Sequence, residues 1–496
     1  MQNDFSLSPL IRPALCLITG IIAGRYVTYA EEMVFAILLG LLAAAFLLRK
    51  SGMWQSLCIC LVCAAVGCLL CLHRQRQMLV SWPEEEQEYE LVVVSEPVQR
   101  GKTLAADALL AATGQKIQLR LMPGEESLNI GDGLIVFSQL KPLSAQGNYR
   151  TFLETHGYTG EVFAWSNRWH HAVISLQGIG VLNRTRLFFM MQRHRLLEQF
   201  SSNIRDQDHY AILAAMALGD KSAVSRQQKE QFSQAGTSHL LALSGLHLGI
   251  IYMLLTLLLR SRRQQLVNQL LIVGCIWAFV LLVGMSPSVV RAAVMISVYA
   301  FVSLLNRGKT PINTLAFTAI IMLTANPYSL FDAGFQLSFC SVLAILLFVP
   351  LLTRLISQQW LDRHKIVRIL WSMMVVSVAA QIGTAPLVAY YFGRFPVYFL
   401  LANLVSIPLA TAILYTMFVV LLFTWWPAAQ AVLAVVPSTL AFWLSSWTSA
   451  IAALPYASIE GISPTILQVA AAYVFIACLW YLLHYYVCSI KKECSM

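Results

Sequence analysis

The sequence predicts a mainly α-helical polytopic membrane protein, with about 12 transmembrane helices and one inserted small β-barrel domain that is OB-like and extracytoplasmic. Composition is the first observation behind this fold class. Of the 496 residues, 58% are hydrophobic and only 12% are charged, against about 25% charged in a typical soluble domain. The second is the arrangement: apolar runs approach the ~20 residues that cross a hydrocarbon core, and a single long hydrophilic stretch, 74–239, interrupts them.

Apolar runs bounded by turn and charge signals predict the spans. They are 9–28, 32–48, 54–72, 240–259, 266–285, 288–305, 312–325, 335–352, 369–390, 398–424, 429–452 and 464–487. We interpret the first as a retained span and not as a signal peptide, because Arg25 and two more apolar runs follow it. The segment 312–325 is short for a full crossing, so we expect it to tilt or to re-enter.

The formal net charge of +10 lies entirely in the membrane part, because the stretch 74–239 holds 17 basic and 17 acidic residues. Cytoplasmic loops are enriched in Lys and Arg, which predicts an inner (plasma) membrane protein with both termini in the cytoplasm and 74–239 outside. Arg25 and Arg394 then lie in short outer loops. The basic residues expected inside are Arg12, Arg49, Lys50, Arg260, Arg262, Arg263, Arg307, Lys309, Arg354, Arg363, Lys365, Arg368, Lys491 and Lys492.

The 11 cysteines do not predict a disulfide in the outer domain, because none lies between Cys71 and Cys275. Five of them share the apolar segment 58–71, which contains no His or carboxylate. This pattern favours close helix packing by small side chains over metal binding. We therefore expect no metal and no cofactor.

The outer stretch begins with short β-type runs: Tyr89–Ser95, Thr103–Ala111, Lys116–Met122 and Gly133–Leu140. Tight turns between them predict a small barrel, for which the OB-fold is a natural candidate. An OB-fold that binds nucleic acid presents a basic groove with aromatic faces. The residues that could guide DNA in this way are Arg100, Lys102, Lys116, Arg120, Tyr149, Arg150 and Trp165, with Tyr158, Phe163 and Trp169 as further aromatic candidates.

An alternative stays open, because residues 74–170 hold 9 basic and 12 acidic side chains, so these candidates could equally be ordinary surface charge and barrel core. Between 183 and 204, Arg and His alternate with Leu, Phe and Met. This pattern predicts a basic amphipathic helix on the outer leaflet. Anchoring to lipid headgroups is favoured there over contact with passing phosphates, and the two can coexist.

Polar side chains inside membrane segments are costly, so they usually face a bundle interior or a water-filled path. Ser244 and His247 lie three residues apart and would share one helix face. A membrane-embedded hydrolase would need an acid to orient the base, and the nearest, Asp220, lies outside the span. A polar lining is the favoured interpretation, and its candidates are Ser238, His239, Ser244, His247, Arg291, Gln336, Ser338, Gln381, Thr384 and Asn403.

Ordered motifs in this region resemble the ComEC-type competence protein family, polytopic channels for transforming DNA. The hallmark is His239-Leu-Leu-Ala-Leu-Ser244-Gly245-Leu-His247, preceded by Leu218-Gly219-Asp220. Further matches are Gly284 with Arg291-Ala292, Asn326-Pro327 with Phe331-Asp332-Ala-Gly-Phe335-Gln336-Leu-Ser338-Phe339, Gln381 with Thr384-Ala-Pro386-Leu387, and Leu401-Ala-Asn403-Leu404 with Pro408.

The resemblance implies an inner-membrane channel that passes single-stranded DNA into the cytoplasm during natural competence, and no enzyme. It also implies separate DNA receptor, nuclease and cytoplasmic motor proteins as partners besides DNA and the lipid bilayer. Many family members carry a C-terminal metallo-β-lactamase-like domain, and we expect this chain to be a short form without one. Arg291 could contact entering phosphates or pair with Asp332. The alternative function is a polytopic transporter of another polyanionic or polar solute.

We expect the outer region to lie between three N-terminal transmembrane helices and a C-terminal channel domain. The boundaries are 1–73 for the first helices, 74–170 for the OB-like domain, 171–238 for an amphipathic helical connector, 239–490 for the channel domain and 491–496 for a cytoplasmic tail.

Overall fold

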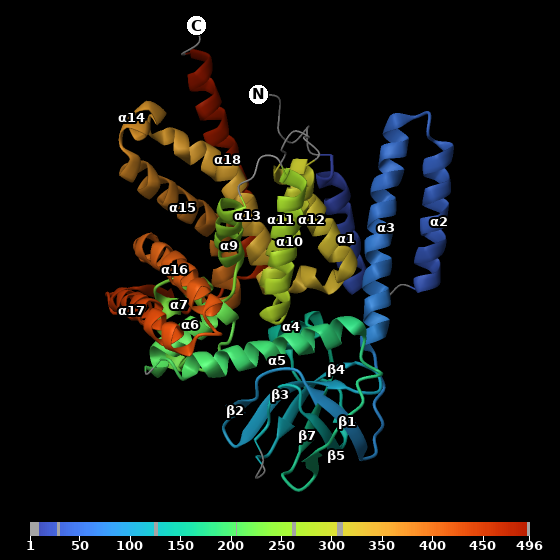
Figure 1. The fold of residues 1–496 in the computed structure, drawn as a ribbon. Coiled ribbons are helices and arrows are strands. Elements are labelled where there is room, and N and C mark those ends of the chain that lie inside the picture. The colour runs from blue at the N-terminus through green and yellow to red at the C-terminus, as the bar shows by residue number, and fades with distance from the viewer. Residues whose placement is uncertain are drawn as a thin grey trace. The chain divides into compact units, whose positions relative to one another are not determined.

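The computed structural model describes residues 9–26, 30–123, 127–204, 206–259, 264–304 and 311–493, and helices dominate it (Figure 1). The chain divides into two compact units that alternate along the sequence. The first unit holds Met1–Arg195, Gln265–Met285 and Ala293–Asp332, and the second holds Leu196–Gln264, Ser286–Ala292 and Ala333–Met496.

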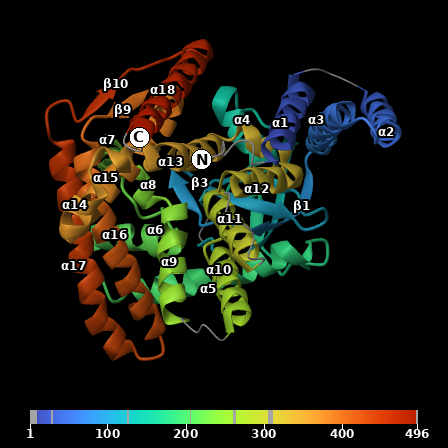
Figure 2. The ribbon, with the colours of Figure 1, turned by 90° about the horizontal axis from the view of Figure 1, so that it is seen from above.

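In the first unit, apolar helices accompany one β-sheet. The helices that belong wholly or mainly to it are α1 (Ile11–Tyr26), α2 (Glu31–Leu47), α3 (Gly52–Met78), α4 (Gly147–Thr155), α5 (Val181–Ser201), α10 (Gln265–Leu282), α11 (Pro287–Leu304), α12 (Pro311–Ala325) and the 3-10 helix η2 (Pro327–Phe331). Figure 2 shows α1, α3 and α2 as neighbours, in agreement with the packing of α3 against both of the others.

Small residues let α1 and α3 approach closely. A methyl group at Gly20 would overlap the carbonyl oxygen of Ala64, and one at Gly67 would overlap that of Leu17. Gly24 faces Cys68 and Cys71 in the same way. The glycines of a Gly-x-x-x-Gly pattern permit backbone contact of this kind between helices in lipid. The buried thiols Cys68 and Cys71 thus belong to the helix packing.

The β-sheet of the first unit has eight strands. They are β1 (Gln87–Val93), β2 (Val98–Arg100), β3 (Thr103–Leu110), β4 (Lys116–Leu121), β5 (Gly133–Ser138), β6 (Leu140–Lys141), β7 (Tyr158–Ala164) and β8 (Trp169–His171). Their order is β6-β7-β4-β3-β1-β5-β8, with β2 paired to β3. Among the strand pairs that the described residues form in this sheet, β4 with β7 is the parallel one. Strand β5 pairs with β1, and β6 pairs with β7. A single residue separates β5 from β6, so this one stretch of chain connects the two ends of the row β7-β4-β3-β1.

Side chains cover both faces of this sheet. One face encloses a core that includes Leu91, Leu119, Leu134 and Val162. On the other, Val92, Val94 and Leu109 pack against Leu187 and Met190 of α5. The four β-type runs expected from the sequence are strands in the structure. The sequence analysis did not identify β7, β8 or helix α4 as elements.

A polar junction joins the sheet domain to the helices of the first unit. Arg25, at the end of α1, donates to the Glu154 carboxylate of α4 at 2.7 Å. The same guanidinium lies 4.8 Å from the centre of the Tyr328 ring in η2. Asn326 Nδ2 donates to the Thr155 carbonyl oxygen at 3.1 Å. Burial raises the pKa of the Tyr328 hydroxyl, so this side chain stays neutral beside the arginine.

The second unit is a helical assembly. Its elements are α6 (Gln207–Leu218), α7 (Arg226–Gln234), α8 (Ser238–Leu241), α9 (Gly245–Leu258), α13 (Ala333–Leu352), η3 (Thr353–Leu355), α14 (Gln358–Arg363), α15 (Lys365–Phe392), α16 (Phe399–Leu422), α17 (Pro427–Ala452), α18 (Ile466–Glu493) and the strands β9 (Arg394–Pro396) and β10 (Ser458–Glu460). Helix α13 packs on α15, α16 packs on α17, and α18 contacts α13 and α15. Every residue of α6 from Ala211 to Leu218 is buried.

Eight helices in the described part of the chain are long and apolar enough to cross a membrane: α3, α10, α11, α13 with η3, α15, α16, α17 and α18. The other four expected spans are also helical but have 16, 17, 14 and 15 residues in α1, α2, α9 and α12, below the ~20 of a full crossing. Residues 27 and 28 of the first expected span, the basic residues Arg260, Arg262, Arg263, Arg307 and Lys309, and tail residues 494–496 lie outside the described residues.

The approach of α1 to α3 can be tested by adding one methyl group. We expect Gly20→Ala to destabilise the protein, because a side chain there meets the Ala64 backbone, and overpacking costs about 1–3 kcal/mol. Gly40→Ala in α2 is the matched control, since a methyl group there meets no neighbouring atom and alanine favours the helix by about 1 kcal/mol. Thermal unfolding in detergent should show a lower Tm for Gly20→Ala alone; equal Tm values would contradict the packing account.

Candidate functional site

The outward surface of strands β3, β4 and β7 gathers exposed aromatic rings around Arg120. Arg120 lies opposite Ala105 on β3 and opposite Phe163 on β7. The Phe163 and Trp165 rings meet edge to face, with centroids 5.3 Å apart. These side chains alternate with the buried positions of their strands, which is why they share one face.

Helix α4 adds two more rings beside this surface. Tyr149 and Phe152 stack with centroids 6.2 Å apart, and Gln118 of β4 donates to the Tyr149 hydroxyl at 3.0 Å. Phe152 is 44% exposed and Trp165 is 55% exposed, which is unusual for large aromatic side chains away from an interface. We call Arg120, Tyr149, Phe152, Phe163 and Trp165 the aromatic face. The sequence analysis missed Phe152, although its helical spacing from Tyr149 was a signal.

The other predicted DNA-guiding residues are not among those that form this face. Arg100 and Lys102 are exposed at the turn between β2 and β3. Arg150 donates to Glu154 at 3.0 Å, so its charge is partly matched. Lys116, at the other end of β4, has its ammonium 3.1 Å from Asp107.

Two of the further aromatic candidates are buried, Trp169 in the apolar core of the sheet and Tyr158 beside Lys116 and Asp107. Tyr158 and Trp169 are each 7% exposed. The Tyr158 hydroxyl donates to Asp107 at 2.7 Å, and the Trp169 indole donates to the Met122 carbonyl oxygen. Burial and the neighbouring Asp107 charge raise the pKa of Tyr158. These two rings therefore support the sheet and are not free to stack on a ligand.

In the second unit, the motif from His239 to His247 forms a helix break. The sequence predicted a continuous span over 240–259, but α8 ends at Leu241 and α9 starts at Gly245. Ser244 is extended and caps α9, while His247 Nδ1 accepts from the Ser244 amide at 3.4 Å and lies 3.0 Å from its hydroxyl oxygen. A Ser three residues before a side-chain acceptor is the capping-box arrangement. Ser244 and His247 therefore supply hydrogen-bond partners at the helix break.

Exposure differs within this motif. Ser238 and His239 are exposed, Ser244 is partly buried and His247 is completely buried. The contact of Ser244 with His247 links the serine to an imidazole, but among the described residues no acid is hydrogen-bonded to His247 to orient it as a base. This geometry favours capping over a nucleophile and base pair.

A glycine and an ion pair fix the segment that precedes the motif. Gly236 has a left-handed φ of 77° and lies against Pro396 and Phe399, so a side chain there would meet both. Arg394 of β9 donates to Glu230 and Ser233 of α7, both at 2.8 Å. Sequence reasoning had placed Arg394 in an outer loop without a role; its partners lie more than 160 residues away, beyond any local pattern.

The other predicted lining residues occupy several helices of the second unit. Gln336 of α13 accepts from the Tyr391 hydroxyl of α15 at 2.9 Å, which joins two helices. Thr384 donates to the Ala380 carbonyl oxygen within α15. Arg291 at the start of α11 and Asn403 in α16 are buried. Ser338 and Gln381 are partly buried in α13 and α15, and their role as lining stays a prediction.

Potential metal ligands do not cluster in the part of the chain that the structure describes: no group of three His, Cys, Asp or Glu side chains is placed to hold an ion. This concerns the described residues alone, and the expectations of no metal and no cofactor stay predictions.

Comparison with known proteins finds a family whose members resemble the second half of the chain. A family model described as "Competence protein" matches residues 216–485. The chain is 27% identical over 265 residues to ComE operon protein 3 of Bacillus subtilis, which covers 53% of this chain and 33% of that protein. It is 22% identical over 242 residues to recombination protein 2 of Haemophilus influenzae, covering 47% of this chain and 31% of that protein.

An uncharacterized protein of Aquifex aeolicus is 30% identical over 230 residues, covering 46% of this chain and 51% of that protein. The matched region thus spans about a third to a half of the length of these relatives. No solved structure matches the chain.

Proposed function

The chain belongs to the competence protein family, and on this premise we propose that it is an inner-membrane channel that carries single-stranded transforming DNA into the cytoplasm. The observation that carries the proposal is the extent of the family match, 216–485, which includes the capped break at Ser244 and His247 and every predicted lining residue. The membrane character follows from the long apolar helices.

We propose that the path is lined by the neutral donors and acceptors of this block, with His239 and Ser238 at its entry. A path for a polyanion has to replace part of the lost hydration without holding the strand too tightly. Exposed or partly buried Ser, Thr and Gln side chains suit that requirement. His247 is enclosed, so its proposed part is to position Ser244 and the start of α9.

The sheet domain is proposed to be an OB-like barrel that receives the strand outside the membrane. Its closed circuit of strand pairing, with one parallel pair, supports the barrel assignment. The aromatic face supports the binding role, because bases stack on exposed rings regardless of sequence and an adjacent arginine contacts the backbone. Arg100 and Lys102 extend the cationic surface at the neighbouring turn.

Separate DNA receptor, nuclease and motor proteins are proposed as partners. This proposal rests on the family membership, and the match covers 33% of ComE operon protein 3 and 31% of recombination protein 2. Movement of a strand needs an energy source, and none of the predicted motifs is a nucleotide-binding loop.

The proposed topology follows the positive-inside rule, with residues 74–239 outside and the 353–368 segment inside. Alkaline phosphatase is active only outside the cytoplasm. Fusions at position 120 should therefore be active, and fusions at 363 should be inactive. The reverse pattern would overturn the orientation.

The aromatic face makes a prediction for DNA binding. We expect Trp165→Ala in the full-length protein to weaken binding of oligothymidylate about tenfold, because loss of one stacking ring costs about 1–3 kcal/mol. Phe137→Ala is the matched control: Phe137 is 40% exposed but lies on β5 beside Arg168, off the aromatic face. Fluorescence anisotropy measures both. Equal losses in the two variants would mean that the face has no special part in binding.

The helix break makes a prediction for uptake. We expect His239→Leu to abolish DNA entry into the cytoplasm at normal protein abundance, because an exposed polar group at the entry is lost. His247→Leu should instead lower abundance, with uptake falling in proportion, because the buried cap is lost. Immunoblotting of membranes and a protected-DNA assay give the two readouts. Normal uptake and abundance in His239→Leu would remove this residue from the proposed path.

A further inference from the structure

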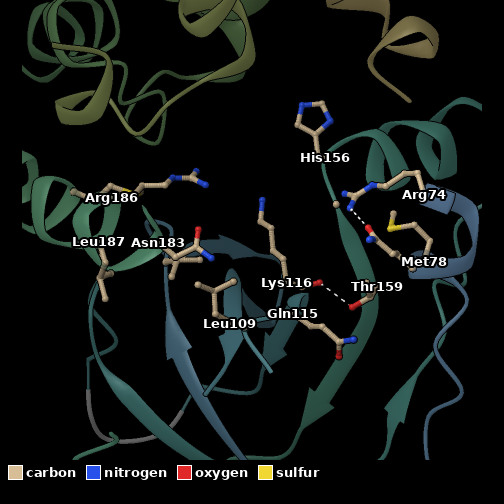
Figure 3. A pocket seen from close by; sticks show the side chains of 15 residues that line it. Arg74, Met78, Leu109, Gln115, Lys116, His156, Thr159, Asn183, Arg186 and Leu187 are labelled. Atoms are coloured by element: carbon tan, nitrogen blue, oxygen red, sulfur yellow. Dashed lines mark hydrogen bonds between the residues drawn. The ribbon is translucent and has the colours of Figure 1, made fainter. Parts of the chain in front are cut away.

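A pocket of about 500 Å³ lies in the first unit where α3, α5 and the strands β4 and β7 meet. Figure 3 shows Arg74 from the end of α3, Lys116 from β4 and Arg186 from α5 directed toward one space. His156 and Asn183 line the same space. Three cationic side chains thus converge from three separate elements, which no local sequence pattern could indicate.

The positive charges of the pocket are only partly matched. Among the described residues its lining contains no Asp or Glu, and the nearby Asp107 is shared between Lys116 at 3.1 Å and the Tyr158 hydroxyl at 2.7 Å. Arg74 donates to the neutral Gln77 side chain. Within the described residues, neither Arg74 nor Arg186 forms an ion pair, and the Nε atom of each is buried without a hydrogen-bond partner.

Burial makes this arrangement costly without an anion. The side chain of Lys116 is 18% exposed, and its burial and the neighbouring Arg186 lower the pKa of its ammonium group, against the opposing effect of Asp107. Burial likewise lowers the pKa of Arg186. Partly desolvated cations of like sign repel one another. A bound phosphate would offset both the desolvation and the repulsion.

The position of the pocket indicates the source of the phosphate. Helix α3 is an apolar helix long enough to span a membrane, and Arg74, Gln77 and Met78 lie in its last turns. The level at which a span ends is the level of lipid headgroups. Leu187 and Met190 of α5 also line the pocket, while Leu182 and Phe188 of α5 are 62% and 57% exposed, as in helices that lie in the interface.

A DNA strand fits this pocket less well. A strand bound to the aromatic face would have to pass along β4 from Arg120 to Lys116. Asp107 and Glu161 flank Gln118 between those two positions in the strand register, so carboxylates interrupt the cationic surface. The apolar lining from Met78, Leu109 and Leu187 suits the glycerol and first methylenes of a lipid better than it suits a nucleotide.

We propose that the pocket formed by Arg74, Lys116 and Arg186 binds the phosphate group of an anionic phospholipid, with the guanidinium groups of α3 and α5 contacting its oxygens. Arginine matches phosphate oxygens through paired N–H donors, and basic pockets beside membrane helices are typical headgroup sites. The lipid would fix α5 to the end of α3 and so set the sheet domain at the membrane surface. This ligand lies outside the proposed translocation path.

The test measures lipid binding to the full-length protein in detergent. Native mass spectrometry with added dioleoylphosphatidylglycerol should show a retained lipid, and dioleoylphosphatidylcholine should compete poorly. We expect Arg186→Gln to weaken retention of phosphatidylglycerol about tenfold, as loss of a charge-assisted contact implies. Arg195→Gln is the matched control, because Arg195 is exposed on the same helix and does not line the pocket, and it should bind like the unmodified protein.

The outcomes distinguish lipid binding in this pocket from DNA binding. Equal loss of phosphatidylglycerol binding in Arg186→Gln and Arg195→Gln would mean that surface charge alone explains the binding. That result would overturn the proposal. Loss of oligothymidylate binding in Arg186→Gln with lipid binding unchanged would assign the pocket to DNA instead. Trp165→Ala should leave lipid binding intact, so failure of the DNA proposal is recognised independently. If Arg186→Gln lowers Tm in the absence of lipid, Arg74→Gln on α3 carries the same test.

Discussion

The hydrocarbon core of a membrane supplies no hydrogen-bond partners, and the fold follows from this constraint. Backbone groups in lipid have to be satisfied within a helix, so the long apolar segments are helices and interruptions need polar side chains beside them. The break between α8 and α9 meets that need through Ser244 and His247. The closest helix contact, α1 on α3, depends instead on glycines, since lipid gives two apolar helix surfaces little reason to associate. Polar side chains thus lie at the helix break, and small side chains lie where α1 and α3 meet.

The sheet domain is subject to a different constraint, because it contacts water on one side and helices on the other. Its inner core is apolar, and Val92, Val94 and Leu109 on the opposite face bind α5. The end of β7, beside Arg120 of β4, carries exposed rings at Phe163 and Trp165. The pocket around Lys116 lies next to α5 and the aromatic face lies around Arg120, four residues along the same strand. One strand thus serves two surfaces of different chemistry, with Asp107 and Glu161 in the row between them.

Local patterns predicted the elements, and long-range contacts decided what the side chains do. Short β-type runs bounded by turn signals located β1, β3, β4 and β5, and apolar runs located the membrane helices. The pattern Ser-Gly-Leu-His has the same spacing inside a helix and at its start, so its spacing alone does not distinguish a continuous span from a helix that begins at Gly245. Lys116 was grouped with Arg120 by charge alone; its partner Asp107 was set by strand register. The run Ala211–Leu218 was placed in a surface connector, although a helix that is apolar on every side is usually buried.

The burial of Ala211–Leu218 in α6 has a consequence for biogenesis. This helix packs on α17, α16 and α8, and α16 begins at Phe399, about 180 residues after α6 ends at Leu218. At synthesis rates of roughly 5–20 residues per second, α6 leaves the ribosome about ten to forty seconds before it can be enclosed. The apolar run Ala211–Leu218 is too short to form a stable membrane span by itself. During this interval the run has neither α16 nor α17 to pack on, and assembly of the second unit is complete only when translation nears its end.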